Sequence, residues 1–170
     1  MPDRDNPAKT CLKMDYDSII YTDGGGKSSC VGGKACAVIT EDGTTPVEIL
    51  YREYSDEMTC NEAEYTAVLL ALEERLYNEK ILLRTDSNLV VKQLAPVNPW
   101  RINFDHLRLL NSLVLDVIRN IGLLVEFEHV PRDDNLAGRY IEGRLIYDRN
   151  KVRIDASKII KKGETALAQL

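Results

Sequence analysis

A strand that leads into an acid and then into glycines is the feature that most restricts the fold of this chain. Residues Ile19–Thr22 are β-branched or aromatic, Asp23 follows them, and three glycines come next. Such residues favour a buried strand, and successive glycines allow the backbone to turn sharply behind it. The sequence therefore predicts that Asp23 lies at the carboxyl end of a buried strand, where its side chain remains accessible.

The pattern after this strand predicts an α/β fold, with a mixed sheet covered by helices. Three strands joined by short turns come first and form an antiparallel meander. The fourth strand follows a helix and is therefore parallel to an earlier one. The expected strands are 18–22, 33–40, 47–54, 80–85 and 123–130. The first expected helix begins after Thr59 and carries an apolar stripe of Tyr65, Leu69, Leu72 and Leu76. The other expected helices are 87–94, a helix that Asp105 caps and Gly122 ends, and 136–147.

Length and composition indicate one soluble domain. The 170 residues are 44% hydrophobic and 29% charged, which is ordinary for a globular protein, and no apolar run reaches the roughly 18 residues of a membrane helix. We expect a cytoplasmic monomer without membrane contact, because we find no signal-peptide core and the four cysteines suit free thiols. We divide the chain into a flexible extension (1–16), a folded domain (17–147) and a basic tail (148–170).

Charge is unevenly distributed along the chain. The net charge of −5 argues against a strongly basic nucleic-acid binder. From Arg139 to Lys162, however, eight basic residues accompany three acids. This segment is either a solvated helix with a frayed tail or a patch that contacts phosphates.

Two further acids are expected to join Asp23. Asp86 follows the strand 80–85, and Glu64 lies near the start of the helix that leads to this strand. If the first and fourth strands are neighbours, all three carboxylates meet at one edge of the sheet. Two like charges 4 Å apart repel by about 1 kcal/mol in water and about 4 kcal/mol when partly buried, so such a cluster suits a hard cation. An all-oxygen set without histidine favours Mg²⁺ or Mn²⁺, and two such ions can support phosphodiester hydrolysis.

A second motif overlaps the first strand. Gly26, Lys27 and Ser28 imitate the end of a phosphate-binding P-loop, but that motif requires a glycine at position 21, which is Tyr21. The residues after Ser28 also predict loop and strand, whereas a P-loop opens a helix. A nucleotide triphosphatase is therefore disfavoured.

Four motifs together resemble type 1 ribonuclease H, and the resemblance covers about residues 18–144 in the family's order and spacing. They are Ile20–Gly25, Asn61–Tyr65, Arg84–Asn88 and His129–Asn135, and Trp100–Ile102 fits the same pattern. The resemblance implies a ribonuclease H-like fold with a five-stranded sheet in the order 3-2-1-4-5 and helices on both faces. It also implies metal-dependent hydrolysis of the RNA strand of an RNA/DNA hybrid.

The resemblance assigns roles to individual residues. Asp23, Glu64 and Asp86 match three catalytic, metal-binding acids, and two Mg²⁺ or Mn²⁺ ions are expected with substrate. Asn61 and Asn88 match positions that contact the hybrid, although helix capping explains them equally well. The other positions with an implied role are Gly24 and Ser29 in substrate binding, and His129 in proton transfer, although its alternation with Val125 and Phe127 favours a packed strand end.

The chain departs from the family where a fourth acid is expected. Four residues after Asn135 stands Arg139, which reverses the charge and becomes a candidate for substrate binding. Asp133 and Asp134, one turn earlier, and Glu142, one turn later, are alternative fourth ligands. Ser29 stands where the family usually has asparagine, and no basic insertion follows the helix 87–94, so the tail is our candidate for additional substrate affinity.

The leading interpretation is a ribonuclease H-type endonuclease with reduced or Mn²⁺-favouring activity. The first alternative keeps the fold without efficient cleavage, as a nucleic-acid-binding or partner-binding protein in which Arg139 fills the fourth site. The second is a nuclease of the same fold that acts on DNA junctions or strand ends.

Overall fold

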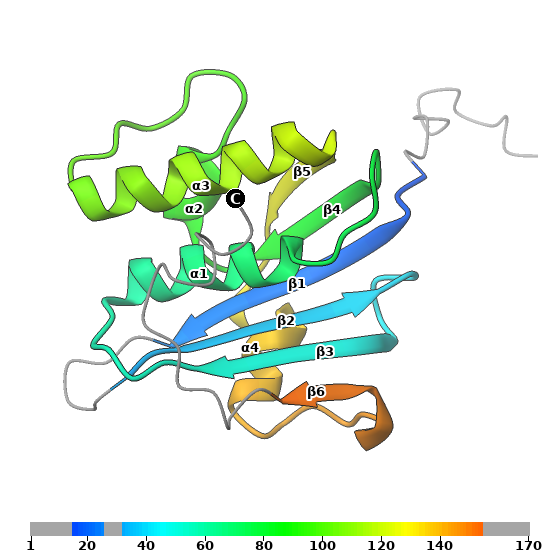
Figure 1. Ribbon diagram of the computed structural model, residues 1–170. Helices are drawn as coiled ribbons and strands as arrows, with labels where there is room; N and C mark the ends of the chain where they lie inside the picture. The colour runs from blue at the N-terminus through cyan, green and yellow to red at the C-terminus, as the bar shows by residue number, and fades with distance from the viewer. Residues whose placement is uncertain (1–14, 26–31, 155–170) are drawn as a thin grey trace, which may run out of the picture.

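A six-stranded sheet forms the centre of the molecule (Figure 1). The computed structural model describes residues 15–25 and 32–154. The strand order is β5-β4-β1-β2-β3-β6, which confirms the predicted order 3-2-1-4-5 and adds a sixth strand beside the third. The strands are β1 (Ser18–Gly25), β2 (Lys34–Thr40), β3 (Pro46–Glu53), β4 (Lys80–Thr85), β5 (Leu124–His129) and β6 (Val152–Ile154).

The sheet is mixed in the predicted way. β2 is antiparallel to both β1 and β3, so the first three strands form the expected meander. β4 is parallel to β1, because the chain returns to the sheet through a helix. β1 and β4 therefore end at the same edge of the sheet, and this edge carries the candidate site. We call it the acidic edge.

Helices cover both faces of the sheet, as predicted (Figure 1). One face carries α1 (Cys60–Leu72), α2 (Asn88–Gln93) and α3 (Asp105–Ile121), and the larger apolar core lies between them and the strands. The fully buried Ala63, Ala67 and Ala71 let α1 pack closely on the sheet. The opposite face carries α4 (Leu136–Ile141), which packs over Tyr21, Cys36 and Val38 in a smaller core.

Three helix boundaries differ from the sequence-based prediction. α1 ends at Leu72, so the expected core residue Leu76 lies in a loop and is 75% exposed. Asp105 is the first residue of α3 and does not cap it, since Phe104 occupies the N-cap position.

The third difference concerns the last helix, which was expected to run to Tyr147. α4 stops at Ile141 because Gly143 adopts φ +72°. The backbone N–H of Arg144 then donates to the carbonyl of Arg139, as in a Schellman motif.

The sheet includes part of the predicted tail. Residues Arg149–Lys151 form a 3₁₀ turn, and β6 pairs in parallel with β3. The rest of the tail, residues 155–170, lies outside the described residues, as does most of the predicted N-terminal extension. Cys36 is a buried free thiol. In the part of the chain that the structure describes, no helix is both long and apolar enough to cross a membrane.

Candidate metal centre

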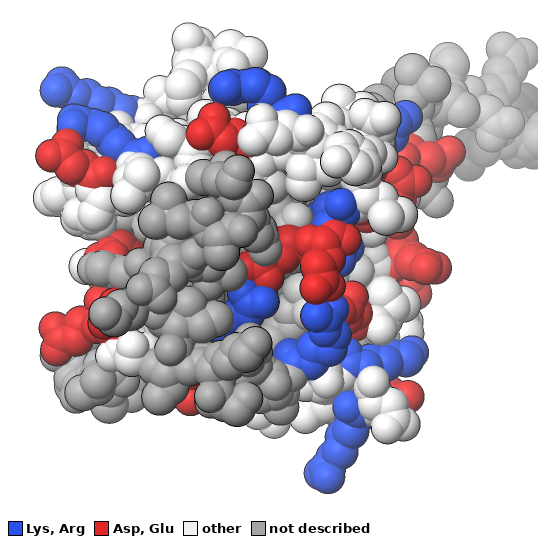
Figure 2. All heavy atoms as spheres, in the orientation of Figure 1, with Lys and Arg blue, Asp and Glu red and all other residues white. Residues whose placement is uncertain are grey.

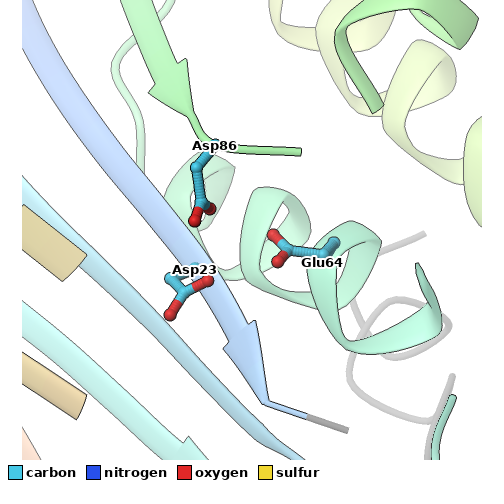
Figure 3. Close-up of side chains that lie close together, drawn as sticks. All are labelled: Asp23, Glu64 and Asp86. Carbon is cyan, nitrogen blue, oxygen red and sulfur yellow. The ribbon is translucent and has the colours of Figure 1, made fainter. Parts of the chain in front are cut away.

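Three acids that are far apart in the sequence come together at the acidic edge (Figure 3). Thr22 of β1 pairs with Thr85 of β4, so Asp23 and Asp86 each lie one residue beyond the same row. Glu64 projects toward them from the start of α1. One carboxylate oxygen from each acid lies within 4.8 Å of the other two. The predicted convergence of Asp23, Glu64 and Asp86 is confirmed.

β1 and α1 are in direct backbone contact beside these acids. A Cβ atom on Gly24 would lie 2.1 Å from the carbonyl carbon of Ala63 and 2.4 Å from the backbone nitrogen of Glu64. Only glycine fits such a close approach. The backbone of Gly24 also hydrogen-bonds to the carboxyl groups of Asp23 and Glu64. The glycine after Asp23 therefore allows Glu64 to reach the cluster.

Burial and mutual repulsion raise the pKa of two of these acids, Asp23 and Glu64. Asp23 is only 4% exposed. Burial raises its pKa to about 6, and the negative charge of Asp86 adds to this effect. The pKa of Glu64 is also raised strongly, first by burial and then by the charges of Asp23 and Asp86. A cation among the carboxylates would relieve this repulsion and favour their charged forms.

The chemistry of the three side chains fits a hard divalent cation. All the available ligand atoms are carboxylate oxygens, which Mg²⁺ and Mn²⁺ prefer. Glu64 Oε2 is buried and has no hydrogen-bond partner among the described residues. A buried acceptor without a partner costs about 1–3 kcal/mol, and a bound cation would supply the missing interaction.

Asn135 connects the acidic cluster to α4. Its side chain is fully buried, and its Nδ2 donates to the carbonyl of Thr22 (2.9 Å) and to Asp86 Oδ1 (3.2 Å). Its Oδ1 accepts from the backbone N–H of Ala137 and so caps α4. This docking brings α4 against the cluster, because a Cβ on Gly138 would lie 3.3 Å from Asp23 Oδ2.

Two arginines and two acids extend from Asp86 along the surface. Arg132 Nη1 lies 3.7 Å from Asp86 Oδ2, and the same guanidinium binds Glu142 Oε1 at 2.9 Å. Glu142 also pairs with Arg144, whose Nη2 lies 3.6 Å from Asp133 Oδ1. The positive charge of Arg132 opposes part of the rise in the pKa of Asp23 that burial and Asp86 cause. Two of the alternative fourth ligands, Asp133 and Glu142, are therefore engaged in ion pairs.

Arg139 lies on α4, directly after Gly138, where the fourth acid was expected. Its side chain is partly buried, and it forms no ion pair with another described residue. Asp134 is exposed on a 3₁₀ turn (Arg132–Asp134) and is not one of the three grouped acids. The contribution of Asp134 to a metal site stays a prediction.

Both asparagines with a predicted substrate role lie beside the acids. The capping interpretation is wrong for each, because Thr59 caps α1 with Glu62 as its capping-box partner, and Ser87 caps α2. Asn61 is the second residue of α1, and Asn88 is the first residue of α2. Their predicted contact with substrate stays open.

His129 and Ser29 were the other residues with a predicted role at the site. His129 ends β5 opposite Thr85, beside the acidic edge, and it is exposed, so the expectation of a packed histidine is wrong. An exposed imidazole at the strand end is accessible for proton transfer, which stays a prediction. Ser29 lies outside the described residues, as does the sequence Gly26–Ser28 that imitates a P-loop.

The sequence matches the RNase H family model over residues 15–138, most of the chain. This chain belongs to the RNase H family. The match contains all three clustered acids and ends one residue before Arg139. A search of curated proteins gave no match.

Solved RNase H structures share the fold. LC11-RNase H1, in complex with an RNA/DNA hybrid, is 26% identical, with 69% of this chain and 88% of that chain covered and a TM-score of 0.61. RNase H1 from the halophilic archaeon Halobacterium salinarum is 26% identical, with coverages of 74% and 98% and a TM-score of 0.62. A foamy viral protease-reverse transcriptase in complex with RNA/DNA hybrid is 19% identical over 72% of this chain and 19% of that chain, with a TM-score of 0.58, and shows the fold alone.

Sequence reasoning did not assign roles to three residues at the site. The sequence places Asn135 in a motif without a role of its own. An asparagine just before a helix is typical of an N-cap, and its amide N–H groups then remain available for other hydrogen bonds. Arg132 and Gly138 carried no signal of their own, since their importance depends on how α4 docks against β1 and β4.

Proposed function

We propose that this chain is a divalent-metal-dependent endonuclease that hydrolyses the RNA strand of RNA/DNA hybrids. The observation that carries the proposal is the convergence of Asp23, Glu64 and Asp86, with Glu64 Oε2 buried and unpaired. Membership of the RNase H family supports the reaction class. The neighbour LC11-RNase H1, which has been solved with a hybrid, supports the substrate class.

Each residue of the centre has a distinct task in this proposal. Asp23, Glu64 and Asp86 would hold two Mg²⁺ or Mn²⁺ ions, which, when bound, activate water and stabilise the leaving oxygen. Asn135 fixes the orientation of Asp86 through its amide hydrogen bond.

The residues around the acids would recognise and serve the substrate. Asn61 and Asn88 flank the acids, where they would contact the minor groove and its 2′-hydroxyl groups. Gly24 exposes backbone at the same point, Ser29 follows β1, and Arg139 would contact a phosphate. His129 would transfer a proton at the strand end.

The positive charge on α4 affects the expected level of activity. Three carboxylates remain, but Arg139 replaces the fourth. We therefore expect cleavage that is weak in Mg²⁺ or favours Mn²⁺. We also expect the protein to act as a monomer in the cytoplasm.

A second candidate is a protein that binds nucleic acid or a partner without efficient cleavage. The pairing of Arg132 with Asp86 favours it, because this contact places positive charge where a cation would bind, and Arg139 stands on α4 in place of the expected fourth acid. A nuclease for DNA junctions or strand ends is a further alternative within the same fold.

One set of assays separates these functions. Hybrid, duplex DNA, duplex RNA and a four-way junction are incubated with wild type and with Asp23→Asn, in Mg²⁺ and in Mn²⁺. The proposal predicts metal-dependent cleavage of the RNA strand of the hybrid, which Asp23→Asn loses while binding is kept. Wild type that binds hybrid but cleaves nothing with either ion supports the second candidate, and cleavage of the junction alone supports the third.

A further inference from the structure

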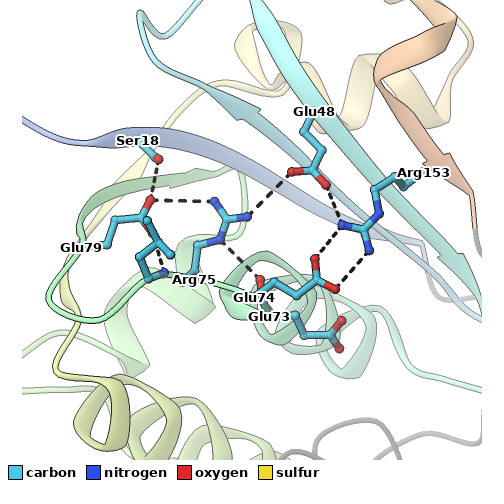
Figure 4. A network of polar contacts seen from close by, with 8 residues as sticks. Ser18, Glu48, Glu73, Glu74, Arg75, Glu79 and Arg153 are labelled. Carbon is cyan, nitrogen blue, oxygen red and sulfur yellow. Dashed lines mark hydrogen bonds and ion pairs between the residues drawn. The ribbon is translucent and has the colours of Figure 1, made fainter.

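The two outer strands of the sheet differ in how their edges are covered. At one side, β6 pairs with β3, and Arg153 forms ion pairs with Glu48 (2.9 Å) and Glu74 (2.6 Å) that hold it there (Figure 4). At the other side, β5 pairs with β4, and no strand of the described residues pairs with the outer edge of β5. An open strand edge is a template for pairing with another chain.

The outer edge of β5 presents backbone groups that are ready for pairing. The N–H groups of Leu124 and Val130 donate inward, to carbonyls at the two ends of β4, at 3.0 and 2.9 Å. Backbone groups alternate between the two sides of a strand, so those that face outward belong to Val125, Phe127 and His129. In the described part of the chain these groups have no backbone partner. A strand along this edge would therefore form a ladder of main-chain hydrogen bonds.

An apolar groove runs beside this edge on the face that α3 covers. Val125 and Phe127 point their side chains to this face, where they pack against the larger core. A hollow of about 760 Å³ is lined by these two residues, by Leu115 and Ile118 of α3 and by Trp100 of the preceding loop. A second hollow, of about 440 Å³, lies at the start of β5 and shares Ile118 and Val125 with the first. We call the two hollows the β5 groove, which alternate side chains of an added strand would enter.

The two faces of the β5 edge differ in charge. Figure 2 shows mainly uncharged atoms over α3 and the loop before it, with a few charged side chains between them. The larger hollow has two charged residues in its lining, Arg101 and Arg108, and both are basic. On the opposite face β5 presents Glu128, which pairs with Arg84, and Glu126, which has no basic partner among the described residues. A fitting strand therefore has apolar side chains toward the groove and basic side chains on the other face.

A second copy of this chain is a poor occupant of the edge. If two β5 strands pair antiparallel with their helices on one face, the longest registers place Glu126 opposite Glu126 or Glu128 of the other copy. Like charges directly opposite each other in a sheet are destabilising, whereas opposite charges stabilise the pair. The acids that disfavour a second copy therefore favour a strand that carries Lys or Arg at these positions.

We propose that β5 binds an extended segment of a partner protein as an added strand, with apolar side chains in the β5 groove and basic side chains beside Glu126 and Glu128. In this mode of recognition main-chain hydrogen bonds supply affinity, and pockets for alternate side chains supply specificity. The interaction surface goes beyond the proposed function and does not depend on it. Because β5 ends beside the acidic edge, the bound segment holds its protein next to the metal centre.

The first test measures binding of a fluorescent, acetylated peptide, Lys-Val-Lys-Phe-Lys-Val-Lys, to the whole protein by anisotropy, without nucleic acid. The control peptide has the same composition, with its lysines in one block. The alternating peptide should bind about tenfold more tightly, because only its basic and apolar side chains point to opposite faces of a strand. Equal affinity of the two peptides would overturn the proposal.

Methylation of peptide nitrogens tests the main-chain ladder. One peptide carries N-methyl groups on its three apolar residues, and a second carries them on the three lysines that follow these residues. Since the N–H groups of a strand alternate between its sides, only one of the two sets faces β5. That set should weaken binding at least about tenfold, while the other set leaves the affinity nearly unchanged. Equal effects of the two sets would exclude an added strand.

A variant of α3 tests the groove. Leu115→Asn removes an apolar wall at a position that is 40% exposed, so the fold should be kept. We expect about fivefold weaker binding of the alternating peptide. The matched control is Leu109→Asn, which changes a leucine of α3 outside the groove that is 57% exposed and should bind as wild type does. Equal losses in the two variants would place the peptide elsewhere.

A variant of β5 tests the charged face. Glu126→Gln should weaken binding about threefold at low salt, and the loss should shrink as the salt concentration rises. The control Glu57→Gln removes an exposed acid from the loop between β3 and α1 and should have no effect. If Glu126→Gln binds the peptide as tightly as wild type, basic side chains do not lie on this face and the proposed partner chemistry is wrong.

Sedimentation of the protein alone separates a partner from a second copy. A monomer that binds the alternating peptide supports the proposal. A dimer that the peptide dissociates would show that a second copy occupies the edge and would overturn it. None of these measurements involves hybrid cleavage, so failure of the proposed function would leave this inference intact, and the reverse also holds.

Discussion

The acidic edge is built from two halves that differ in charge. The first half comprises the ends of β1 and β4 and the start of α1, and it supplies the three clustered carboxylates of Asp23, Glu64 and Asp86. The second half is the turn and helix after β5, where Arg132 pairs with Asp86 and Arg139 stands on α4 at the position of the expected fourth acid. The difference teaches that the three clustered acids keep the geometry of a candidate metal site although arginines stand in the neighbouring half.

The first half should account for nearly all of the chemistry. Asp86→Asn keeps the shape of the side chain and an oxygen for Asn135, but it removes a charged ligand. We expect hybrid cleavage to fall on the order of 10³-fold, since losing metal-based stabilisation costs several kcal/mol and each 1.36 kcal/mol is tenfold. Single-turnover assays measure the loss.

A matched variant controls for the loss of one charge. Asp116→Asn removes a partly exposed acid on α3 that pairs with Arg119, away from the acidic edge, and it should cleave as wild type does. Equal losses in the two variants would mean that Asp86 acts through general charge and would remove the distinction between the halves.

Metal binding should stabilise the first half measurably. At an ion concentration of 100 times Kd, the free energy of unfolding should increase by about 2.7 kcal/mol, which thermal or urea denaturation in Mn²⁺ and in EDTA would detect. Asp23→Asn should lose this increment. A similar increment in Asp23→Asn would place the ion elsewhere.

The increase in the free energy of unfolding that the metal causes should also depend on pH. The pKa of Asp23 is raised to about 6 in the folded protein. A carboxyl with a raised pKa binds its proton more tightly when folded, so without metal its contribution to stability is lost as pH rises from about 4 to about 6. Protons compete with the ion over the same range, so metal stabilisation should grow as pH increases through it. An increment that is independent of pH would contradict this coupling.

The hydrogen bonds that Asn135 of the second half donates to Thr22 and Asp86 of the first half should matter mainly for the free energy of unfolding. Asn135→Ala leaves the carbonyl of Thr22 and the N–H of Ala137 without their partners in a buried site. We expect a loss of about 2 kcal/mol in the free energy of unfolding, together with reduced cleavage because Asp86 loses its orientation. Asn120→Ala, in an exposed position on α3, is the control. Equal stability of the two variants would show that α4 is held mainly by its apolar contacts.

The second half should respond to restoration of the acid. Arg139→Asp replaces the cation on α4 by the carboxylate that the family pattern expects, and we predict about a tenfold gain in Mg²⁺-supported cleavage, equivalent to 1.4 kcal/mol. Arg149→Asp makes the same charge change outside the site and should show no gain. No gain in Arg139→Asp would indicate that the second half has been adapted to another role.

The sequence was most informative where local pattern and topology agree. Asp23 and Asp86 follow recognisable strands, and a parallel pair of strands must end together, so their convergence could be predicted. The capping box of Thr59 and Glu62 fixed the start of α1 and, with it, the position of Glu64.

Features that depend on docking could not be predicted in the same way. β6 has only three residues, and its pairing depends on the edge of β3 and on Arg153, which no local pattern reveals. The contacts of Arg132 with Asp86 and of Gly138 with Asp23 depend on the orientation of α4. The end of α4 depends on the positive φ of Gly143, whereas the apolar residues that follow continue the helical pattern in the sequence.

The most direct measurement of the metal centre is anomalous diffraction from crystals soaked in Mn²⁺. The proposed site predicts a peak among the carboxylates of Asp23, Glu64 and Asp86, with Glu64 Oε2 turned toward it, and no such peak in Asp23→Asn crystals. A peak elsewhere, or none at these acids with Arg132 still paired to Asp86, would contradict the account.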